Sequence, residues 1–136
     1  MRIFFDTNIF LDVLFNRQPF VMASREIVSG AIEQKYEGAI SALTIVNAIY
    51  ISKKYGLSQT EAKHKIATIC KYLSVLDLKG NDAQECLKTN WHDYEDCIQY
   101  TSADHFSCDI IITRNPKDFA KSKIKVLTPD AFLHKE

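Results

Sequence analysis

The polar residues of this chain that could do chemistry stand next to its most strand-like stretches. Asp6 directly follows an apolar run at the N-terminus, and Asp96 lies in the first turn of a predicted helix that leads into a second such run. Asn115 and Asp118 come after that second run. If the two runs are parallel strands of one sheet, these four side chains can meet at its carboxyl edge.

Carboxylates that lie close together repel one another, so such a group is costly unless a cation neutralises it. Mg²⁺ and Mn²⁺ fit this role because both accept oxygen ligands, and neither histidine nor thiolate is needed. An ion of this kind can make a nucleophile from bound water and offset the charge that builds on a phosphoryl oxygen. The pattern therefore indicates metal-assisted hydrolysis of a phosphodiester.

Each of these residues also has a purely structural interpretation. Asp6 can cap a helix that begins at Thr7 or Asn8, and its spacing alone favours that role. Asp118 can cap a short segment after it, and Asn115 can form an ordinary turn with the proline that follows. Periodicity does not decide between the structural and the chemical roles.

Asp93 and Asp96 stand three positions apart, as a helix cap and the third helical residue do. The helix dipole favours acidic groups at both positions. For Asp93 we expect the cap rather than metal binding.

The elements that must position these residues follow from the pattern of apolar and turn-forming residues. The expected strands are 3–5, 38–41, 75–78, 109–113 and 124–127. The expected helices begin after Asp6, at Phe20, at Ala42, after Ser58 in a capping box with Glu61, after a cap at Asn81 or Asp82, at Tyr94 and after Asp130. We expect Gly56 to end the helix that begins at Ala42.

Strands that alternate with helices along the whole chain predict the α/β class, with three layers and a mostly parallel central sheet. We expect residues 1–136 to form a single domain, because the sequence shows no internal repeat, low-complexity tract or linker. The 17 basic and 17 acidic residues cancel, so any attraction for nucleic acid must be local.

The chain shows no signal for a membrane or for export. An acidic residue interrupts the N-terminal apolar run too early for a signal peptide, and no later run approaches the length of a membrane span. We therefore expect a cytoplasmic protein without a membrane partner. The cysteines include no C-x-x-C pair, and we expect buried, reduced thiols at Cys70, Cys86, Cys97 and Cys108.

Two motifs of the chain, the second divided between two segments, resemble those of the PIN-domain nucleases. Residues 4–12, FFDTNIFLD, resemble the family's opening segment of apolar residues followed by D-T-N. Residues 94–100, YEDCIQY, followed by residues 109–119, DIIITRNPKDF, are similar to the family's E-D-a-i-q-y helix and its T-R-N-x-x-D-F strand end. The order of the predicted elements fits the PIN-like fold over the whole chain.

The resemblance implies roles for individual residues. It makes Asp6, Asp96 and Asp118 the acids that bind Mg²⁺ or Mn²⁺ and carry catalysis, with Thr7, Asn8, Thr113 and Asn115 in supporting polar roles. The family more often has glutamate where Asn47 follows the second strand. An amide oxygen can still coordinate Mg²⁺ or hold a ligated water, but it adds no negative charge and cannot act as a base.

As a single domain of this size, the chain is similar to the VapC-like toxins of toxin–antitoxin pairs. The resemblance implies an endoribonuclease with an RNA substrate, a small antitoxin partner and a homodimer. Arg114 and Lys117, beside the predicted acids, are candidates for phosphate contacts. Arg17, Arg25, Lys53 and Lys54 are further candidates, although a solvated helix face is the simpler interpretation of the two lysines.

Two other functions remain open at this point. A catalytically weak PIN domain could bind RNA or a protein, and Asn47 is the feature that favours it. A purely structural module would leave the acids as helix caps and predicts no response to metal. On the helix that begins at Ala42, we expect Ile45, Ile49 and Tyr50 to belong to the core rather than to a dimer face.

Overall fold

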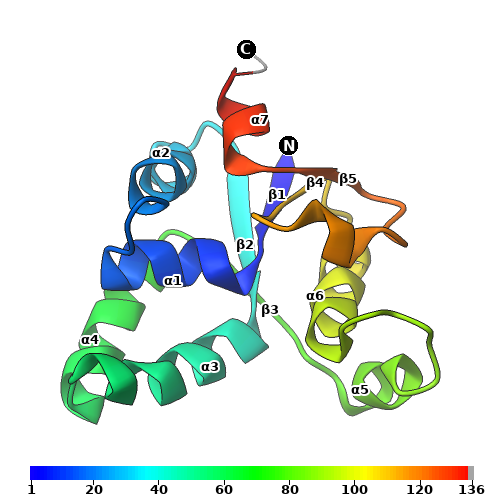
Figure 1. The fold of residues 1–136 in the computed structure, drawn as a ribbon, viewed down its shortest axis with the longest axis horizontal. Coiled ribbons are helices and arrows are strands. Elements are labelled where there is room, and N and C mark those ends of the chain that lie inside the picture. The colour runs from blue at the N-terminus through cyan, green and yellow to red at the C-terminus, as the bar shows by residue number, and fades with distance from the viewer. Residues whose placement is uncertain (135–136) are drawn as a thin grey trace.

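The chain folds into one twisted parallel sheet with helices on both faces (Figure 1), as a computed structural model of residues 1–134 shows. The strands are β1 (Arg2–Phe5), β2 (Glu37–Ser41), β3 (Ser74–Leu76), β4 (Ile110–Ile112) and β5 (Lys125–Leu127). They lie in the order β3-β2-β1-β4-β5, and every neighbouring pair is parallel. This confirms the predicted α/β class.

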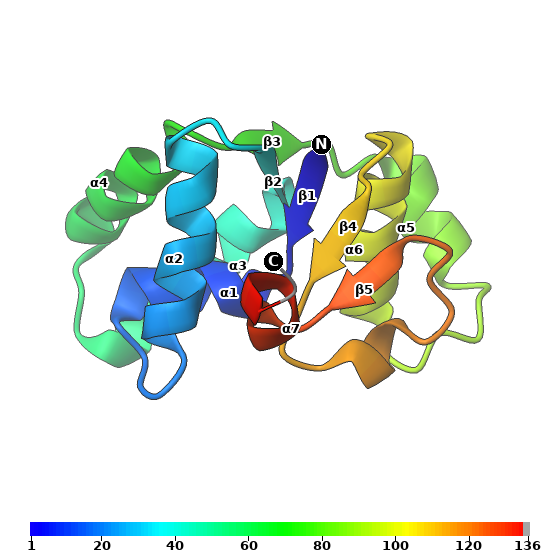
Figure 2. The same ribbon diagram turned by 90° about the horizontal axis from the view of Figure 1, so that it is seen from above.

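The helices divide into two layers, which Figure 2 shows on either side of the sheet. The helices are α1 (Thr7–Phe15), α2 (Val21–Ile32), α3 (Ala42–Ser52), α4 (Gln59–Cys70), α5 (Gly80–Cys86), α6 (Tyr94–His105) and α7 (Pro129–His134), with short 3₁₀ helices η1 (Lys53–Tyr55) and η2 (Pro116–Phe119). Residues of α1, α2, α3, α4 and α7 pack in one core, and α6 and η2 contribute to the other.

The alternation of side chains in β1 explains why there are two cores. Ile3 and Phe5 point into the core beneath α1 and α2, whereas Phe4 points to the opposite face and packs with Ile111 and Phe119. The side chains of Ile3, Phe4 and Phe5 are all fully buried. β1 therefore lies at the centre of the molecule and fixes the position of whatever follows it, which is Asp6.

Most of the predicted helix ends are confirmed, and a few boundaries were wrong. Ser58 and Glu61 form the capping box of α4, and Gly56 adopts a left-handed conformation with φ of 75°. The helix from Ala42 ends as an α-helix at Ser52 rather than at Tyr55, and continues as η1. The Ser52 hydroxyl donates to the carbonyl of residue 48 at 2.7 Å, a bond that competes with the regular backbone pattern.

The third strand was predicted at residues 75–78, but β3 spans Ser74–Leu76, so it begins one residue earlier and ends two residues earlier than predicted. Ser74 pairs with β2, and its hydroxyl donates to Glu37 Oε2 at 2.9 Å. This hydrogen bond stabilises the first residue of β3. The apolar pattern of the sequence did not indicate that the strand begins at a serine.

The expected free thiols are present among the described residues, but their placement is closer than the sequence suggested. Cys86 and Cys97 come from α5 and α6, and their sulfur atoms lie 2.9 Å apart. Burial raises the pKa of Cys86 to about 11, with the neighbouring thiol adding to the effect, which keeps it protonated. Cys70 is only half-buried, whereas the other three cysteines are buried.

Candidate functional site

The end of β1 lies near α1, α3 and α6 (Figure 1). Residues of these elements line a cavity of about 410 Å³. Most of the residues that line it carry an oxygen atom at the end of the side chain. They are Asp6, Thr7, Asn8, Leu11, Asn47, Tyr50, Ile51, Lys54, Asp93, Glu95, Asp96, Asn115 and Asp118. The structure thus brings together the three predicted acids at the carboxyl edge of the sheet.

Asp6 lies in the wall of this cavity and does not cap α1 through its side chain. It is 5% exposed, and its two carboxylate oxygens accept hydrogen bonds from different elements. Oδ1 accepts from Gln99 Nε2 at 2.9 Å, and Oδ2 accepts from Thr113 Oγ1 at 2.7 Å. Burial raises the pKa of Asp6, and these two hydrogen bonds partly offset that effect. The capping interpretation of Asp6 was therefore wrong.

Gln99 connects the end of β1 with α6, and its role was missed from the sequence. Its amide nitrogen donates to Asp6 and also to Asp96 Oδ1 at 3.2 Å. Its amide oxygen accepts from the backbone nitrogen of Thr7 at 2.9 Å and from the Thr7 hydroxyl at 3.1 Å. The Thr7 hydroxyl also shares a hydrogen bond with Thr44 of α3. The buried Gln99 amide thus binds two acids, Asp6 and Asp96, and links α6 to α1 through Thr7.

The position of Gln99 in the sequence contained a usable signal. It stands three residues after Asp96, so the two side chains lie on the same face of α6. A polar side chain on that face, in a helix that precedes a buried strand, needs a polar partner.

Asp96 lies in the first turn of α6, as predicted, and is partly buried. Its pKa is raised to about 7, first by burial and then by the negative charges of Asp6, Asp93, Asp118 and Glu95. All four of those carboxylates line the same cavity. The acids at this edge therefore repel one another, as their spacing in the sequence predicted.

Asp93 is confirmed as the cap of α6. Its Oδ1 accepts from the backbone nitrogen of Asp96 at 3.0 Å. The side chain still lines the cavity, so its charge acts on Asp96 even though its hydrogen bond serves the helix.

The segment after β4 brings the remaining predicted residues to the site. Thr113 is fully buried, donates to Asp6 and accepts from the backbone nitrogen of Asn115 at 3.1 Å. Asn115 and Asp118 both line the cavity. Asp118 lies inside η2 and so does not cap a segment after it, which corrects that interpretation.

Asn47 lines the cavity from α3, and its side chain bonds to Glu95, an acid that the family resemblance included in a motif but gave no role. Its Nδ2 donates to Oε1 of Glu95 at 3.0 Å, across the gap between α3 and α6. Glu95 is accessible to solvent, and partial desolvation at the cavity wall together with the charge of Asp93 raises its pKa. Glu95 stands beside Asp96 in the sequence, and only the contact with α3 shows that both face the same cavity.

The donor set of this cavity fits the chemistry of a hard divalent cation, because it consists of carboxylate and amide oxygens that repel one another. Within residues 1–134, however, no three His, Cys, Asp or Glu side chains stand close enough to share one metal ion. The two oxygens of Asp6 are already held by Gln99 and Thr113. The donor types therefore fit such a cation, while the described carboxylates are not grouped around a single point.

Arg114 is committed to a buried ion pair and does not line the cavity. It lies 3.2 Å from Asp12, which is fully buried, and its guanidinium stacks over the ring of Phe20. Arg17 and Ser24 bind the same carboxylate at 2.9 Å and 3.0 Å. The arrangement ties together α1, α2 and the end of β4.

The cationic candidates separate by location. Lys54 is exposed and lines the cavity, whereas Lys117 is exposed on η2 outside the set of lining residues, and Arg25 donates to Asn16. Tyr50, which we expected in the core, is 66% exposed and also lines the cavity. Tyr50 and Lys54 stand four positions apart on the same side of α3 and η1, so they give the acidic cavity an aromatic and a basic rim.

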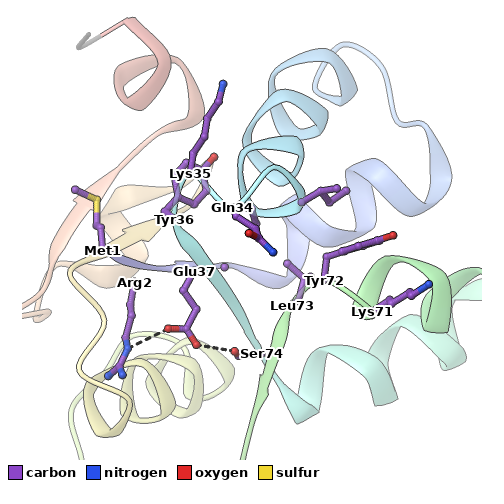
Figure 3. Close-up of a pocket in the computed structure, with 13 residues that line it drawn as sticks. Met1, Arg2, Gln34, Lys35, Tyr36, Glu37, Lys71, Tyr72, Leu73 and Ser74 are labelled. Atoms are coloured by element: carbon purple, nitrogen blue, oxygen red, sulfur yellow. Dashed lines mark hydrogen bonds and ion pairs between the residues drawn. The ribbon is translucent and has the colours of Figure 1, made fainter.

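A larger cavity of about 670 Å³ lies at the opposite, amino edge of the sheet (Figure 3). Its wall holds Glu37, which is paired with Arg2 at 3.3 Å and bonded by Ser74. Parallel sheets place their functional groups at the carboxyl ends of the strands, and the acids gather there. The smaller cavity is therefore the better candidate site.

Comparison with known proteins agrees with this assignment of the fold. A family model described as "PIN domain" matches residues 2–117. The chain is 22% identical to "Ribonuclease VapC1" of Aquifex aeolicus over 139 aligned positions, which cover 98% of this chain and 94% of that protein.

Two solved structures illustrate the likeness in three dimensions. A toxin–antitoxin complex from Klebsiella pneumoniae matches with a TM-score of 0.67 and 25% identity over 93% of this chain and 96% of that chain. VapBC2 from Rickettsia felis, bound to a DNA fragment from its promoter, matches with a TM-score of 0.70 and 15% identity over 94% and 98% of the two chains. Among the described residues, no helix has the length and apolar character that crossing a membrane requires.

Proposed function

The chain belongs to the PIN-domain family, and we propose that it is a divalent-metal-dependent endoribonuclease, the toxin of a toxin–antitoxin pair. The observation that carries this proposal is the cavity at the carboxyl edge of the sheet, where Asp6, Asp96 and Asp118 meet. The similarity to a protein named as a VapC ribonuclease supports the reaction, and the similarity to a toxin–antitoxin complex supports an antitoxin partner. We further propose that the protein acts as a homodimer.

In this proposal Asp6, Asp96 and Asp118 hold Mg²⁺ or Mn²⁺. Bound there, such an ion would supply an acidified water molecule and a positive charge beside the scissile phosphate. Gln99 and Thr113 fix the Asp6 carboxylate at the end of β1, so its position costs no further ordering when the ion arrives. Asn115 and Asn8 offer polar groups to the same cavity.

The rim of α3 and η1 supports a role for Tyr50 and Lys54 in holding RNA. Lys54 can pair with a phosphate next to the acids, and Tyr50 offers an exposed ring on which an unpaired base can stack. Arg114 is a weaker candidate than the sequence suggested, because its guanidinium already serves Asp12.

A second candidate function is a PIN domain that binds RNA or a protein without cutting it. The observation that favours it is Asn47, an amide in the cavity wall, together with the open spacing of the acids. This candidate predicts RNA binding through the same rim with no cleavage at saturating Mn²⁺.

The experiment that tests the leading proposal compares wild type with Asp96→Asn and Asp104→Asn. Both changes remove one charge from α6, but Asp104 is exposed at the far end of the helix and lies outside the cavity. We expect Mn²⁺ to raise the melting temperature of wild type and of Asp104→Asn, and to raise that of Asp96→Asn far less.

Cleavage is measured on a single-stranded RNA oligonucleotide with Mn²⁺ and with EDTA. We expect cuts inside the strand for wild type and the control variant, and none for Asp96→Asn. A folded wild-type protein that neither binds Mn²⁺ nor cleaves RNA would remove the metallonuclease proposal. Mn²⁺ binding and RNA binding without cleavage would instead select the second candidate.

A further inference from the structure

We propose that Glu95 is a fourth acidic group of the site, and that the amide of Asn47 holds its carboxylate toward the cavity. This inference rests on the proposed function, because it concerns how the same cavity binds its cation. It assigns a role to an acid outside the three that the sequence singled out, and it gives Asn47 a positioning role instead of a place among the metal ligands.

The placement of Glu95 is the first observation. It lines the same cavity as Asp6, Asp96 and Asp118, and its residue lies in the first turn of α6. Neighbouring residues of a helix point in directions about 100° apart, so Glu95 and Asp96 approach the cavity from different sides. Glu95 faces α3, whereas Asp96 faces the end of β1 through Gln99.

The contact with Asn47 is the second observation. Asn47 Nδ2 donates to Glu95 Oε1 at 3.0 Å, and the two residues are 48 positions apart in the sequence. A lysine or arginine at position 47 would neutralise Glu95, and a carboxylate there would repel it. An amide does neither: it orients the carboxylate through one oxygen and leaves the negative charge and the second oxygen free for a cation.

The charge of the cavity wall therefore depends on the pair rather than on position 47 alone. Asn47 adds no charge from α3, but its partner Glu95 supplies one negative charge from α6. Among the described lining residues, Lys54 is the one with a positive charge. The cavity keeps a net negative charge that suits a divalent cation even though α3 contributes only an amide.

The test is a charge exchange across this contact, with Mn²⁺ affinity measured by titration calorimetry. The variants are Glu95→Gln, Asn47→Glu and the double exchange Asn47→Glu/Glu95→Gln. Glu26→Gln, an exposed residue of α2 outside the cavity, is the matched control for loss of one glutamate. The amide oxygen that Glu95→Gln introduces can still accept from Asn47, so this variant removes the charge and keeps the contact.

We expect Glu95→Gln to weaken Mn²⁺ binding about tenfold or more, because the Coulomb attraction of one negative charge to the 2+ ion is lost. Glu26→Gln should bind like wild type. The double exchange should recover most of the affinity that Glu95→Gln loses, because it places one carboxylate at position 47 on α3 and so restores the number of acids in the cavity. Asn47→Glu alone should lower the melting temperature of the metal-free protein and enlarge its shift on adding Mn²⁺.

The positioning role of Asn47 has its own readout. Asn47→Ala keeps every acid but frees the Glu95 side chain, so Mn²⁺ affinity should fall by a factor of about two to five from the lost ordering, with little change in the metal-free melting temperature. Wild-type affinity in Asn47→Ala would overturn the positioning role.

The outcomes separate this inference from the proposed function. If wild type binds Mn²⁺, Asp96→Asn does not, and Glu95→Gln binds like wild type, then the proposed function stands and the role of Glu95 is overturned. If wild type itself binds no Mn²⁺, the proposed function fails and this inference fails with it. Loss in Glu95→Gln with recovery in the double exchange supports both.

Discussion

Gln99 Nε2 donates to Asp6 Oδ1 at 2.9 Å and so joins two residues that lie 93 positions apart in the sequence. The amide is 1% exposed, and each of its polar atoms bonds to more than one partner. Gln99 therefore holds Asp6, after β1, and Asp96, in the first turn of α6, in a fixed relation to each other.

Replacement of Gln99 by methionine should lower the free energy of unfolding by about 1–3 kcal/mol, because Asp6 and the backbone nitrogen of Thr7 lose buried partners. The two side chains have similar lengths, so the effect reports the polar contacts. Urea denaturation measures it, with Gln84→Met on the exposed side of α5 as the control. Equal stability of the two variants would mean that the buried amide carries no net stabilisation.

The raised pKa of Asp96 predicts how metal-free stability depends on pH. A folded-state pKa of about 7 lies above the unfolded value of 3.8, so the folded protein binds more protons between these values and loses stability as pH rises through them. Asp6 and Glu95 shift in the same direction and steepen the loss. Asp96→Asn should flatten the dependence.

Melting temperatures in EDTA between about pH 5 and pH 8 measure this dependence. Asp104→Asn should reproduce the wild-type curve, because its charge lies outside the cavity. Mn²⁺ should show the opposite trend, with apparent affinity increasing toward high pH as the proton on Asp96 is released. A wild-type protein whose metal-free stability rises from pH 5 to pH 8 would contradict the assignment.

Much of this fold follows from features that are local in the sequence. The apolar run of β1, the capping box of Ser58 and Glu61 and the apolar run at Ile110–Ile112 each depend on residues close in the chain, and each was predicted. The parallel order of the sheet followed from the alternation of strands and helices. The meeting of Asp6, Asp96 and Asp118 at one edge then followed from the topology.

The contacts within the site could not be predicted in this way, because they join distant segments through single side chains. Asp6 was better explained as a cap from its neighbours alone, and only Gln99 and Thr113 show why it turns to the cavity. Tyr50 has an apolar ring at a helical position, which suggested the core, yet α3 presents it to solvent beside the acids. Asp12 drew no attention because Arg114, which pairs with it, stands 102 positions away in the sequence.

Arg114→Ala should lower the free energy of unfolding by about 1–3 kcal/mol, because the fully buried Asp12 carboxylate loses one of two cationic partners. Arg17 and Ser24 remain bound to Asp12 and limit the loss. Urea denaturation measures the effect, and Lys117→Ala, on the exposed side of η2, is the control, with an expected change within about 0.5 kcal/mol. Similar values for both variants would remove the structural role of Arg114.

Lys54→Ala should weaken binding of single-stranded RNA without changing the stability of the protein. Lys54 is exposed at the end of the α3 wall, so its removal takes a positive charge from the cavity rim and no packing from the core. Fluorescence anisotropy with a labelled oligonucleotide measures the affinity at two salt concentrations, and the salt dependence should be shallower for the variant. Lys63→Ala, an exposed residue of α4, is the matched control. Identical binding by the two variants would place the RNA elsewhere.

Asp93 combines a helix cap with a charge in the cavity wall, and two substitutions separate these roles. Asp93→Ala removes the acceptor for the backbone nitrogen of Asp96 and should cost about 1 kcal/mol of stability. Asp93→Asn keeps an oxygen acceptor at the cap and loses only the charge, so it should cost less, about 0.5 kcal/mol from the helix dipole.

Asp93→Ala and Asp93→Asn both remove one negative charge from the cavity wall, so both should change the pKa of Asp96 in the same direction. Because the charge of Asp93 raises the pKa of Asp96, both variants should move the pH midpoint of metal-free stability below the wild-type value. Mn²⁺ affinity should fall much less than in Asp96→Asn, since the Asp93 carboxylate is occupied by the cap. Chemical denaturation across pH and titration calorimetry measure the two effects. A loss of metal binding in Asp93→Asn as complete as that in Asp96→Asn would make Asp93 a metal-binding acid and reverse this division of roles.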